Sequence, residues 1–423
     1  MKSLIKSCCI CVLVALSACN PSPPAAPTKP FMEKTPVSTE TAFIPSPTET
    51  PTKNPKKTTF IKTFGDTRRD RGINLIETND GGFAIVGYTS SFGAGGEDVY
   101  LVRTDPYGKM LWYRTYGGEG TDNGWDILQT EDNGFMILGF TDSFGAGEMD
   151  IYLIRTDSDG QKLWERTFGE AKSEYGWALA GTPDGGFVLA GQTDSIGEGD
   201  KDGYLVKVDA NGDELWSQTY GGPEEDRLYS VDRCVDGGFV LTGTTKSFGA
   251  DNRNAYLIKT NSSGALEWMQ VFGENLDDVG HSVRQTMDKG YIVTGYTKSF
   301  GAANYDIWMI KADDTGQLEW QKFYGETRDD RTIYGEQTDD GGYIFVGYSK
   351  SFGAGGWDAF LVRAEPTGEV LWHKTFGGQS DDTGYTVIQA SDQGFILTGE
   401  TYSFGEGGGD MLLIKVDKNG EIH

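Results

Sequence analysis

Short apolar segments separated by Gly- and Asp-rich turns recur along the chain from residue 60 onward. Within one stretch, four such segments predict four strands, at 124–130, 135–141, 150–155 and 163–168. The turn Asp132-Asn133-Gly134 joins the first two, because Asn-Gly readily supplies the positive φ angles of a hairpin. The second and third segments are apolar almost without alternation, which is typical of strands covered on both faces. The pattern therefore predicts an all-β fold.

This four-strand unit repeats with a period of 52 residues that never changes. Its clearest marker is a tryptophan that follows Leu or Glu, at Trp112, Trp164, Trp216, Trp268, Trp320 and Trp372. Residues 60–423 hold seven full periods. Seven consecutive four-stranded units predict a seven-bladed β-propeller. Because one blade cannot bury both of its faces alone, we expect the stability to come from the stacking of blades and the closure of the ring.

The sequence also predicts how the ring closes. The last period ends at His423, where its fourth strand would begin. Residues 60–65 have the pattern of that missing strand, since Phe60-Ile61-Lys62-Thr63-Phe64-Gly65 matches residues 164–169. We predict that this N-terminal segment pairs with the last blade, joins the two ends of the propeller and covers an otherwise open edge.

The first 19 residues have the features of a signal peptide. Lys2 and Lys6 precede an apolar run, 8–16, that is too short to span a bilayer as a helix. The run ends in Leu16-Ser17-Ala18-Cys19, which resembles the bacterial lipobox. The resemblance implies that Cys19 is lipidated and anchors the chain to a membrane, extracytoplasmically in the cell envelope. The alternative is an ordinary secretory signal with an incidental cysteine.

Residues 20–57 hold ten of the 14 prolines, with Thr and Ser filling much of the rest. That composition cannot form a core and predicts an extended, disordered stalk. The propeller is therefore expected at 58–423. Only Cys234 lies in the repeats, so no disulfide within the processed chain is possible.

The net charge of −26 limits the possible partners. The first 59 residues carry more Lys than Glu, so the repeats are more acidic than the chain as a whole. Such a ring repels nucleic acid and anionic lipid, and it favours cations, basic proteins or neutral glycans.

The turn before the marker tryptophan has the pattern Asp-x-x-Gly-x-x-x-Trp, as at Asp157, Gly160 and Trp164. This pattern resembles the tryptophan-docking motif of quinoprotein propellers and, more loosely, the Asp-box of sialidases, although the spacing differs from both. The resemblance implies a structural role, with the tryptophan wedged between blades. The adjacent cysteines of the quinoprotein enzymes and the arginine cluster of sialidases are not matched in the repeats, so we expect neither a cofactor nor a catalytic residue. We also expect no metal site, because 209–214 lacks the full spacing of a calcium loop.

The third predicted strand of every repeat carries a cation, and the first hairpin turn carries an aspartate. We expect the cations to form structural pairs beside each blade with carboxylates in the neighbouring turns, and we expect the aspartates to serve the hairpin turn rather than seven metal loops. The cations are Arg103, Arg155, Lys207, Lys259, Lys311, Arg363 and Lys415, and the aspartates are Asp80, Asp132, Asp184, Asp236, Asp288, Asp340 and Asp392.

Two sets of residues near the first strand are candidates for ligand binding, because function in a propeller should lie where loops gather and repeats diverge. The acidic set is Asp70, Asp122, Glu174, Asp226, Asp278, Asp330 and Asp382. If these carboxylates converge on a channel mouth, they favour bound cations or partial protonation. The alternative is that each caps its own loop.

The second candidate set varies between repeats and consists of Ile73, Trp125, Trp177, Tyr229, His281, Ile333 and Tyr385. Aromatic residues at a concave mouth can stack on sugar faces or apolar ligands. The alternative is packing between adjacent inner strands. Neighbouring residues that break the repeat symmetry are Arg71, Tyr175, Arg227, Asp232, Arg233, Arg284, Arg331, Tyr334 and Glu336.

Over residues 58–423 the chain resembles the broad group of secreted bacterial and archaeal β-propeller repeat lipoproteins. The leading hypothesis is a monomeric, non-catalytic module that binds a protein or glycan partner through the divergent loop face. The alternative is an extracellular carbohydrate-active hydrolase or lyase that uses acidic-set carboxylates as acid and base. The alternative requires two of these carboxylates to face each other across an open pocket.

Overall fold

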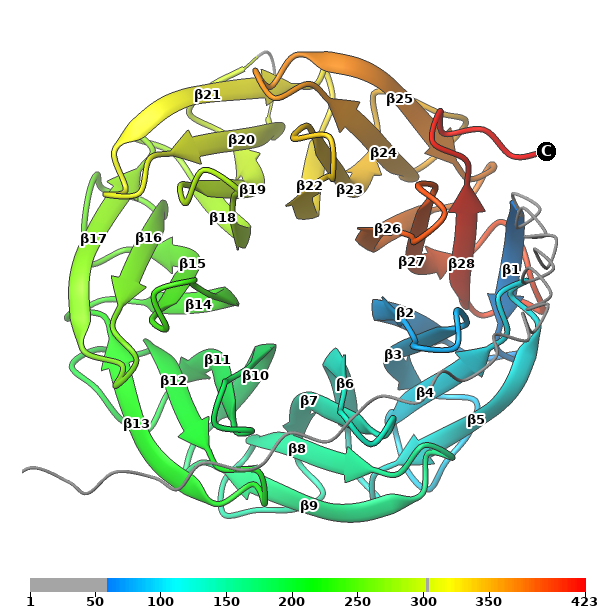
Figure 1. Cartoon of the computed structure of the whole chain (residues 1–423), viewed down its shortest axis with the longest axis horizontal. Coiled ribbons are helices and arrows are strands. Elements are labelled where there is room, and N and C mark those ends of the chain that lie inside the picture. The colour runs from blue at the N-terminus through cyan, green and yellow to red at the C-terminus, as the bar shows by residue number, and fades with distance from the viewer. Residues whose placement is uncertain (1–58, 302–303) are drawn as a thin grey trace, which may run out of the picture. The chain divides into compact units, whose positions relative to one another are not determined.

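The structure is a computed structural model that describes residues 59–301 and 304–423. The predicted signal peptide with Cys19, and the predicted stalk, lie outside the described residues. Within them, seven antiparallel four-stranded sheets stand around a common axis as the blades of a propeller (Figure 1). This arrangement confirms the predicted all-β, seven-bladed fold. No helix among the described residues has the length and hydropathy needed to cross a membrane.

In six blades the four strands follow one another outward from the axis in chain order, and in the last blade β26, β27 and β28 are followed by β1 as the outer strand. The innermost strands are β2 (Asp70–Glu77), β6 (Asp122–Gln129), β10 (Glu174–Gly181), β14 (Asp226–Arg233), β18 (Asp278–Gln285), β22 (Asp330–Gln337) and β26 (Asp382–Gln389). The second strands are β3 (Phe83–Thr89), β7 (Phe135–Thr141), β11 (Phe187–Thr193), β15 (Phe239–Thr245), β19 (Tyr291–Thr297), β23 (Tyr343–Ser349) and β27 (Phe395–Thr401).

The third strands are β4 (Asp98–Thr104), β8 (Asp150–Thr156), β12 (Asp202–Val208), β16 (Asn254–Thr260), β20 (Asp306–Ala312), β24 (Asp358–Ala364) and β28 (Asp410–Val416). The outer strands are β5 (Met110–Tyr116), β9 (Lys162–Phe168), β13 (Glu214–Tyr220), β17 (Leu266–Phe272), β21 (Leu318–Tyr324), β25 (Val370–Phe376) and β1 (Phe60–Phe64). The third strands are buried along their whole length, as their continuous apolar sequences predict.

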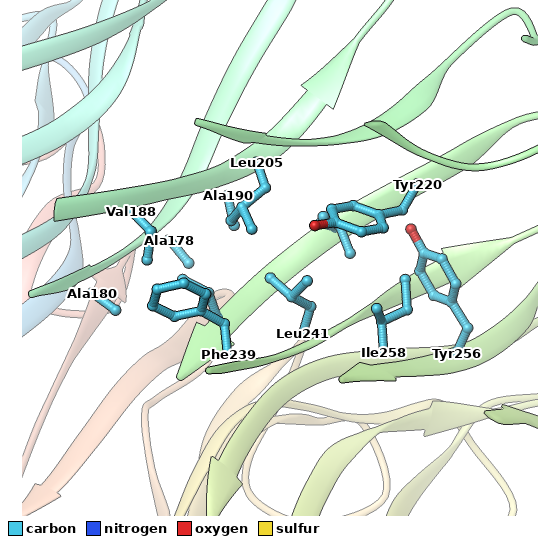
Figure 2. Packing of buried hydrophobic residues seen from close by; sticks show 12 residues of the cluster. Ala178, Ala180, Val188, Ala190, Leu205, Tyr220, Phe239, Leu241, Tyr256 and Ile258 are labelled. Atoms are coloured by element: carbon cyan, nitrogen blue, oxygen red, sulfur yellow. The ribbon is translucent and has the colours of Figure 1, made fainter. Parts of the chain in front are cut away.

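The hydrophobic core lies between blades. In one such layer, Val188 and Leu205 of one blade face Phe239, Leu241 and Ile258 of the next (Figure 2). Small residues from β10 sit opposite the large phenylalanine ring, so the two sheets fit closely. Each blade is therefore covered on both faces by its neighbours.

The N-terminal strand closes the ring as predicted. β1 pairs antiparallel with β28, with Phe60 opposite Lys415 and Phe64 opposite Met411. At the same junction the backbone N–H of His423 donates to Thr59 Oγ1 at 2.7 Å. The first and last described segments therefore share one blade (Figure 1).

The marker tryptophans join neighbouring blades. The ring of Trp112 lies directly against Gly160 in the turn of the following blade, and Gly160 has a φ of 73°. A Cβ at this glycine would overlap the indole, and a positive φ also strains other residues, which explains why glycine accompanies the tryptophan in the motif. At the closure, Phe60 takes the place of the tryptophan and lies against Gly108. The blade-wedging role that the resemblance implies is thus present in the structure.

The predicted ion pairs are also present in every blade. The third-strand cation is buried and reaches the aspartate of the first hairpin, for example at 2.6 Å between Arg155 and Asp132 and at 3.1 Å between Lys207 and Asp184. The remaining five blades repeat the contact. The turn between the two inner strands is thereby tied to the third strand, so this charge pattern is structural.

Candidate functional site

The acidic set lies inside the blades. All seven carboxylate side chains are fully buried at the first residue of their innermost strand. Asp122 shows the arrangement: its carboxylate accepts hydrogen bonds from Thr141 Oγ1, from Ser143 Oγ at 2.7 Å and from Gly118 N at 2.8 Å. These partners belong to the same blade, and they close the loop that enters the innermost strand.

The other six members bond in the same way to a hydroxyl at the end of the second strand, or just after it in the case of Asp226, and to the loop before their own strand. The loop-capping alternative therefore describes Asp70, Asp122, Glu174, Asp226, Asp278, Asp330 and Asp382. None of these carboxylates is among the residues that line the central cavity. A hydrolase or lyase mechanism that takes its acid and base from this set has no support in the geometry.

The varied set, in contrast, meets at the axis. A cavity of about 240 Å³ is lined from all seven innermost strands, and its lining includes every member: Ile73, Trp125, Trp177, Tyr229, His281, Ile333 and Tyr385. The expected convergence of aromatic side chains is therefore present in the structure.

A β-bulge in each innermost strand produces this convergence. In β6, Gly124 pairs with Gly139 and Asp126 pairs with Leu138, so Trp125 has no partner on β7. The same register shift occurs at the corresponding residue of all seven innermost strands. Because a bulged residue leaves the ladder, its side chain can turn away from the sheet faces. Seven bulges thus direct seven side chains into one cavity.

The bulged side chains also pack against one another along half of the ring. The rings of Trp125 and Trp177 meet edge to face at a centroid distance of 4.5 Å. Tyr229 stacks on His281 at 5.0 Å with an interplanar angle of 12°. A contact of 6.5 Å between Trp177 and Tyr229 joins the two pairs. These side chains therefore both pack between adjacent inner strands and line the cavity. The four neighbouring blades that contain β6, β10, β14 and β18 present one continuous aromatic wall.

Several polar atoms in this wall lack partners. Trp125 Nε1, Trp177 Nε1 and Arg227 Nε are buried, and no described residue accepts a hydrogen bond from them. All three groups are donors only. A buried unsatisfied donor costs about 1–3 kcal/mol, so a ligand that accepts hydrogen bonds here would relieve that cost.

Burial shifts the pKa values of two ionisable groups in the cavity lining. Burial lowers the pKa of His281 to about 4, so the imidazole is neutral at pH 7 and contributes no charge. Burial also raises the pKa of Asp126 to about 6. Its carboxylate accepts from Asn74 Nδ2 at 2.6 Å and from Leu179 N of the next blade at 2.7 Å. These contacts join adjacent inner strands, so Asp126 has a structural role in the lining.

A second feature lies at the face where the innermost strands begin and the second strands end, which we call the entry face. At this face, beside the blades formed by β18–β21 and β22–β25, Arg331 Cζ lies 4.1 Å from the ring centroid of Tyr305 and 5.6 Å from that of Trp357. Lys298 and Lys350 each lie 4.3 Å from one of the same two rings. Each contact is a cation–π interaction. Arg331 also contacts Tyr296, which lines the cavity, so this rim cluster is continuous with the aromatic wall.

Comparison with known proteins supports the fold and leaves the function open. No protein family model matches the chain. The chain is 26% identical over 384 residues to the regulatory protein FlaEY of Caulobacter vibrioides, and the alignment covers 74% of this chain and 40% of that protein. This chain therefore spans less than half the length of that relative.

Among solved structures, the WD40 domain of Pan2 from Neurospora crassa superposes with a TM-score of 0.50 at 9% identity, over 83% of this chain and 91% of that one. BamB from Moraxella catarrhalis has a TM-score of 0.42 at 11% identity, with 83% and 85% covered. The chain is a β-propeller. At these identities the likeness concerns the fold alone.

Of the rim cluster, the sequence singles out only Arg331, since Tyr305 and Trp357 lie at loop ends that differ in every repeat.

The bulges were not predicted, although the sequence carries a signal for them. Every second strand has a glycine at its fifth residue, such as Gly139 in β7. A Cβ there would overlap the carbonyl oxygen of Asn123, which the bulge brings close. A glycine inside a strand is a sign of a bulge or of close backbone approach.

Proposed function

We propose that this chain is a lipid-anchored, extracytoplasmic, non-catalytic module that binds a protein or glycan partner at the entry face of its propeller. The observation that carries the proposal is the central cavity, in which seven bulged side chains meet around buried hydrogen-bond donors without partners. Concave sites with aromatic walls and a few oriented polar groups are typical of ligand binding.

The chemistry of the lining supports binding over catalysis. The cavity offers aromatic faces, indole N–H groups, a neutral imidazole and one carboxylate that is already bonded to backbone and amide groups. A general acid and base pair for glycoside hydrolysis needs two carboxyl groups across the scissile bond. Asp126 is the one carboxylate in the lining. No group of three or more metal-ligating side chains occurs among residues 59–301 and 304–423.

The proposal can be tested with the purified full-length chain, screened against a glycan array and against candidate envelope proteins. The double variant Trp125→Ala/Trp177→Ala removes half of the aromatic wall and is expected to abolish the strongest interaction. Leu163→Ala, at an exposed apolar residue of the outer strand β9, is the control and should bind like the unaltered chain. Both variants must keep a cooperative thermal transition. An interaction that survives the double variant unchanged would show that the cavity is not the binding site.

A further inference from the structure

We infer that the central cavity binds a single flat-faced ring that carries a carboxylate group. The ring can be the uronate residue of an acidic glycan or a free aromatic carboxylate, since both offer the same chemistry to the wall. This inference rests on the proposed function and specifies the ligand class of the same site.

The size of the cavity selects one ring. Its volume is about 240 Å³. An apolar cavity of about 150 Å³ is large enough for benzene, and sites for drug-sized ligands occupy about 300–1,000 Å³. One six-membered ring with a small substituent therefore fits.

The walls select a ligand with flat faces. Trp177 meets Trp125 edge to face, and the Tyr229 and His281 rings continue the same wall beside Trp177. Such surfaces stack on the faces of aromatic rings and on the apolar C–H faces of sugar rings. Size and shape alone do not discriminate between these two sources.

The polar groups select hydrogen-bond acceptors. Among the lining residues, Trp125, Trp177 and Arg227 each carry a buried donor without a partner, at the two indole Nε1 atoms and at Arg227 Nε. A neutral sugar presents hydroxyl groups that also need acceptors, whereas a carboxylate accepts only. The Asp126 carboxylate, which could accept, already takes the N–H groups of Ile127, Leu179 and Asn74. The surplus of donors therefore favours a ligand with a carboxylate.

The local charge favours an anion despite the acidic chain. The charged lining consists of Arg227, Arg284 and Asp126, with two cations against one carboxylate. Glu225, which binds Arg227 Nη2, is shared with Lys246 at 2.7 Å and with Arg253 at 3.0 Å. Three cations around Glu225 leave positive charge on the Arg227 side of the cavity, whereas Arg284 lies near the carboxylates of Asp126, Asp232 and Glu336. The planar edge of a guanidinium matches a carboxylate, and Arg227 keeps its Nε for such a contact.

Arg71 provides a matched comparison for Arg227. It occupies the same position of its innermost strand, but its Nε and Nη2 both donate to Glu400. It is also absent from the cavity lining. Substitution of Arg71 thus removes an arginine from the equivalent place without removing a free donor from the site.

The test measures binding to the full-length chain by titration calorimetry with two matched pairs of probes, galacturonate against galactose and benzoate against benzyl alcohol. We expect at least one acid to bind tenfold or more tightly than its neutral partner. Arg227→Gln should remove this preference and Arg71→Gln should keep it. Trp177→Phe, which retains an aromatic ring but loses the N–H group, should weaken the acid several-fold. If Arg227→Gln fails to fold, Arg227→Lys serves in its place and should reduce the preference.

The outcomes separate the inference from the proposed function. If the neutral probes bind as well as the acids and Trp125→Ala/Trp177→Ala abolishes both, the cavity is a binding site and the carboxylate inference is wrong. If Arg71→Gln removes the preference as completely as Arg227→Gln, the effect is a general one of charge and the inference is also wrong. If no probe binds, the inference is overturned, while partner capture on the array still decides the proposed function. Tight binding of galacturonate alone, or of benzoate alone, identifies the source of the ligand.

Discussion

The closure of the ring can be tested at a single side chain. Phe60 is 7% exposed, and its ring packs against Phe83 of the first blade at a centroid distance of 6.4 Å and against Gly108 in the turn after β4. Its strand is hydrogen-bonded to β28 of the last blade. Phe60→Ala would therefore remove the wedge that joins the first and last blades while leaving the backbone pairing of β1 possible.

The expected magnitude follows from burial. Replacement of a buried phenylalanine by alanine costs about 3–5 kcal/mol, because the contacts are lost and a cavity remains. In domains of 150–250 residues each kcal/mol lowers Tm by about 2–4 °C. The propeller is larger than this range, so the low end applies and a decrease of roughly 6–10 °C is expected.

The neighbouring residue provides the control. Ile61 lies in the same strand, but it is 42% exposed. Ile61→Ala should change the free energy of unfolding by about 0.5 kcal/mol or less, as is usual for surface positions. The assay is thermal and urea unfolding of the full-length variants, followed by circular dichroism. Equal transitions for Phe60→Ala and Ile61→Ala, or an unchanged midpoint after deletion of residues 58–64, would refute the closure mechanism.

Three further predictions address the anchor, the turns and the buried charges. Cys19→Ser should move the chain from the membrane fraction to the soluble fraction of fractionated cells, and retention in the membrane would refute lipidation at that residue. Gly212→Ala should lower Tm by several degrees, because Gly212 has a φ of 79° and lies against the Trp164 ring; an unchanged Tm would contradict the wedge. Burial raises the pKa of Glu336 to about 7 despite Arg284, so the contribution of this group to stability is full below its unfolded pKa near 4.5 and is lost as the pH rises through 7. Unfolding measured between pH 5 and 8 should show this decline, and Glu336→Gln should flatten it; the same slope in both proteins would exclude Glu336 as its source.

The fold could be predicted from the sequence because each structural requirement recurs seven times. A strict period, a hairpin aspartate, a third-strand cation and a tryptophan in the outer strand each leave a visible pattern. Closure could be predicted too, since Phe60 lies one full period before Trp112. These residues serve contacts inside one blade or between adjacent blades, and such contacts are the same all around the ring.

The site could be predicted only in part, because recurrence does not indicate where a side chain points. Asp122 and Trp125 are three residues apart in the same strand, yet the Asp122 carboxylate closes a loop inside the blade and the Trp125 side chain reaches the axis. The sequence alone places both positions at the expected channel mouth. The rim residues Tyr305 and Trp357 occupy the same position in two consecutive repeats. They left no pattern, since the other five repeats have no aromatic residue at that position.

The bulges explain both the location of the cavity and the variation of its lining. In a regular strand, side chains point to the two faces of the sheet, and in this propeller both faces are covered by neighbouring blades. A residue that stayed in the ladder would have to fit that packing, and residues such as Ile137 and Leu138 of β7 are indeed apolar and fully buried. A bulged residue is released from the constraint, so its position accepts Ile, Trp, Tyr or His without disturbing a blade. The innermost strand therefore combines a fixed capping acid at its start with a variable residue at its bulge. Changes of ligand preference should consequently accumulate at the bulged positions, where the chemistry of the cavity can change while the seven blades remain intact.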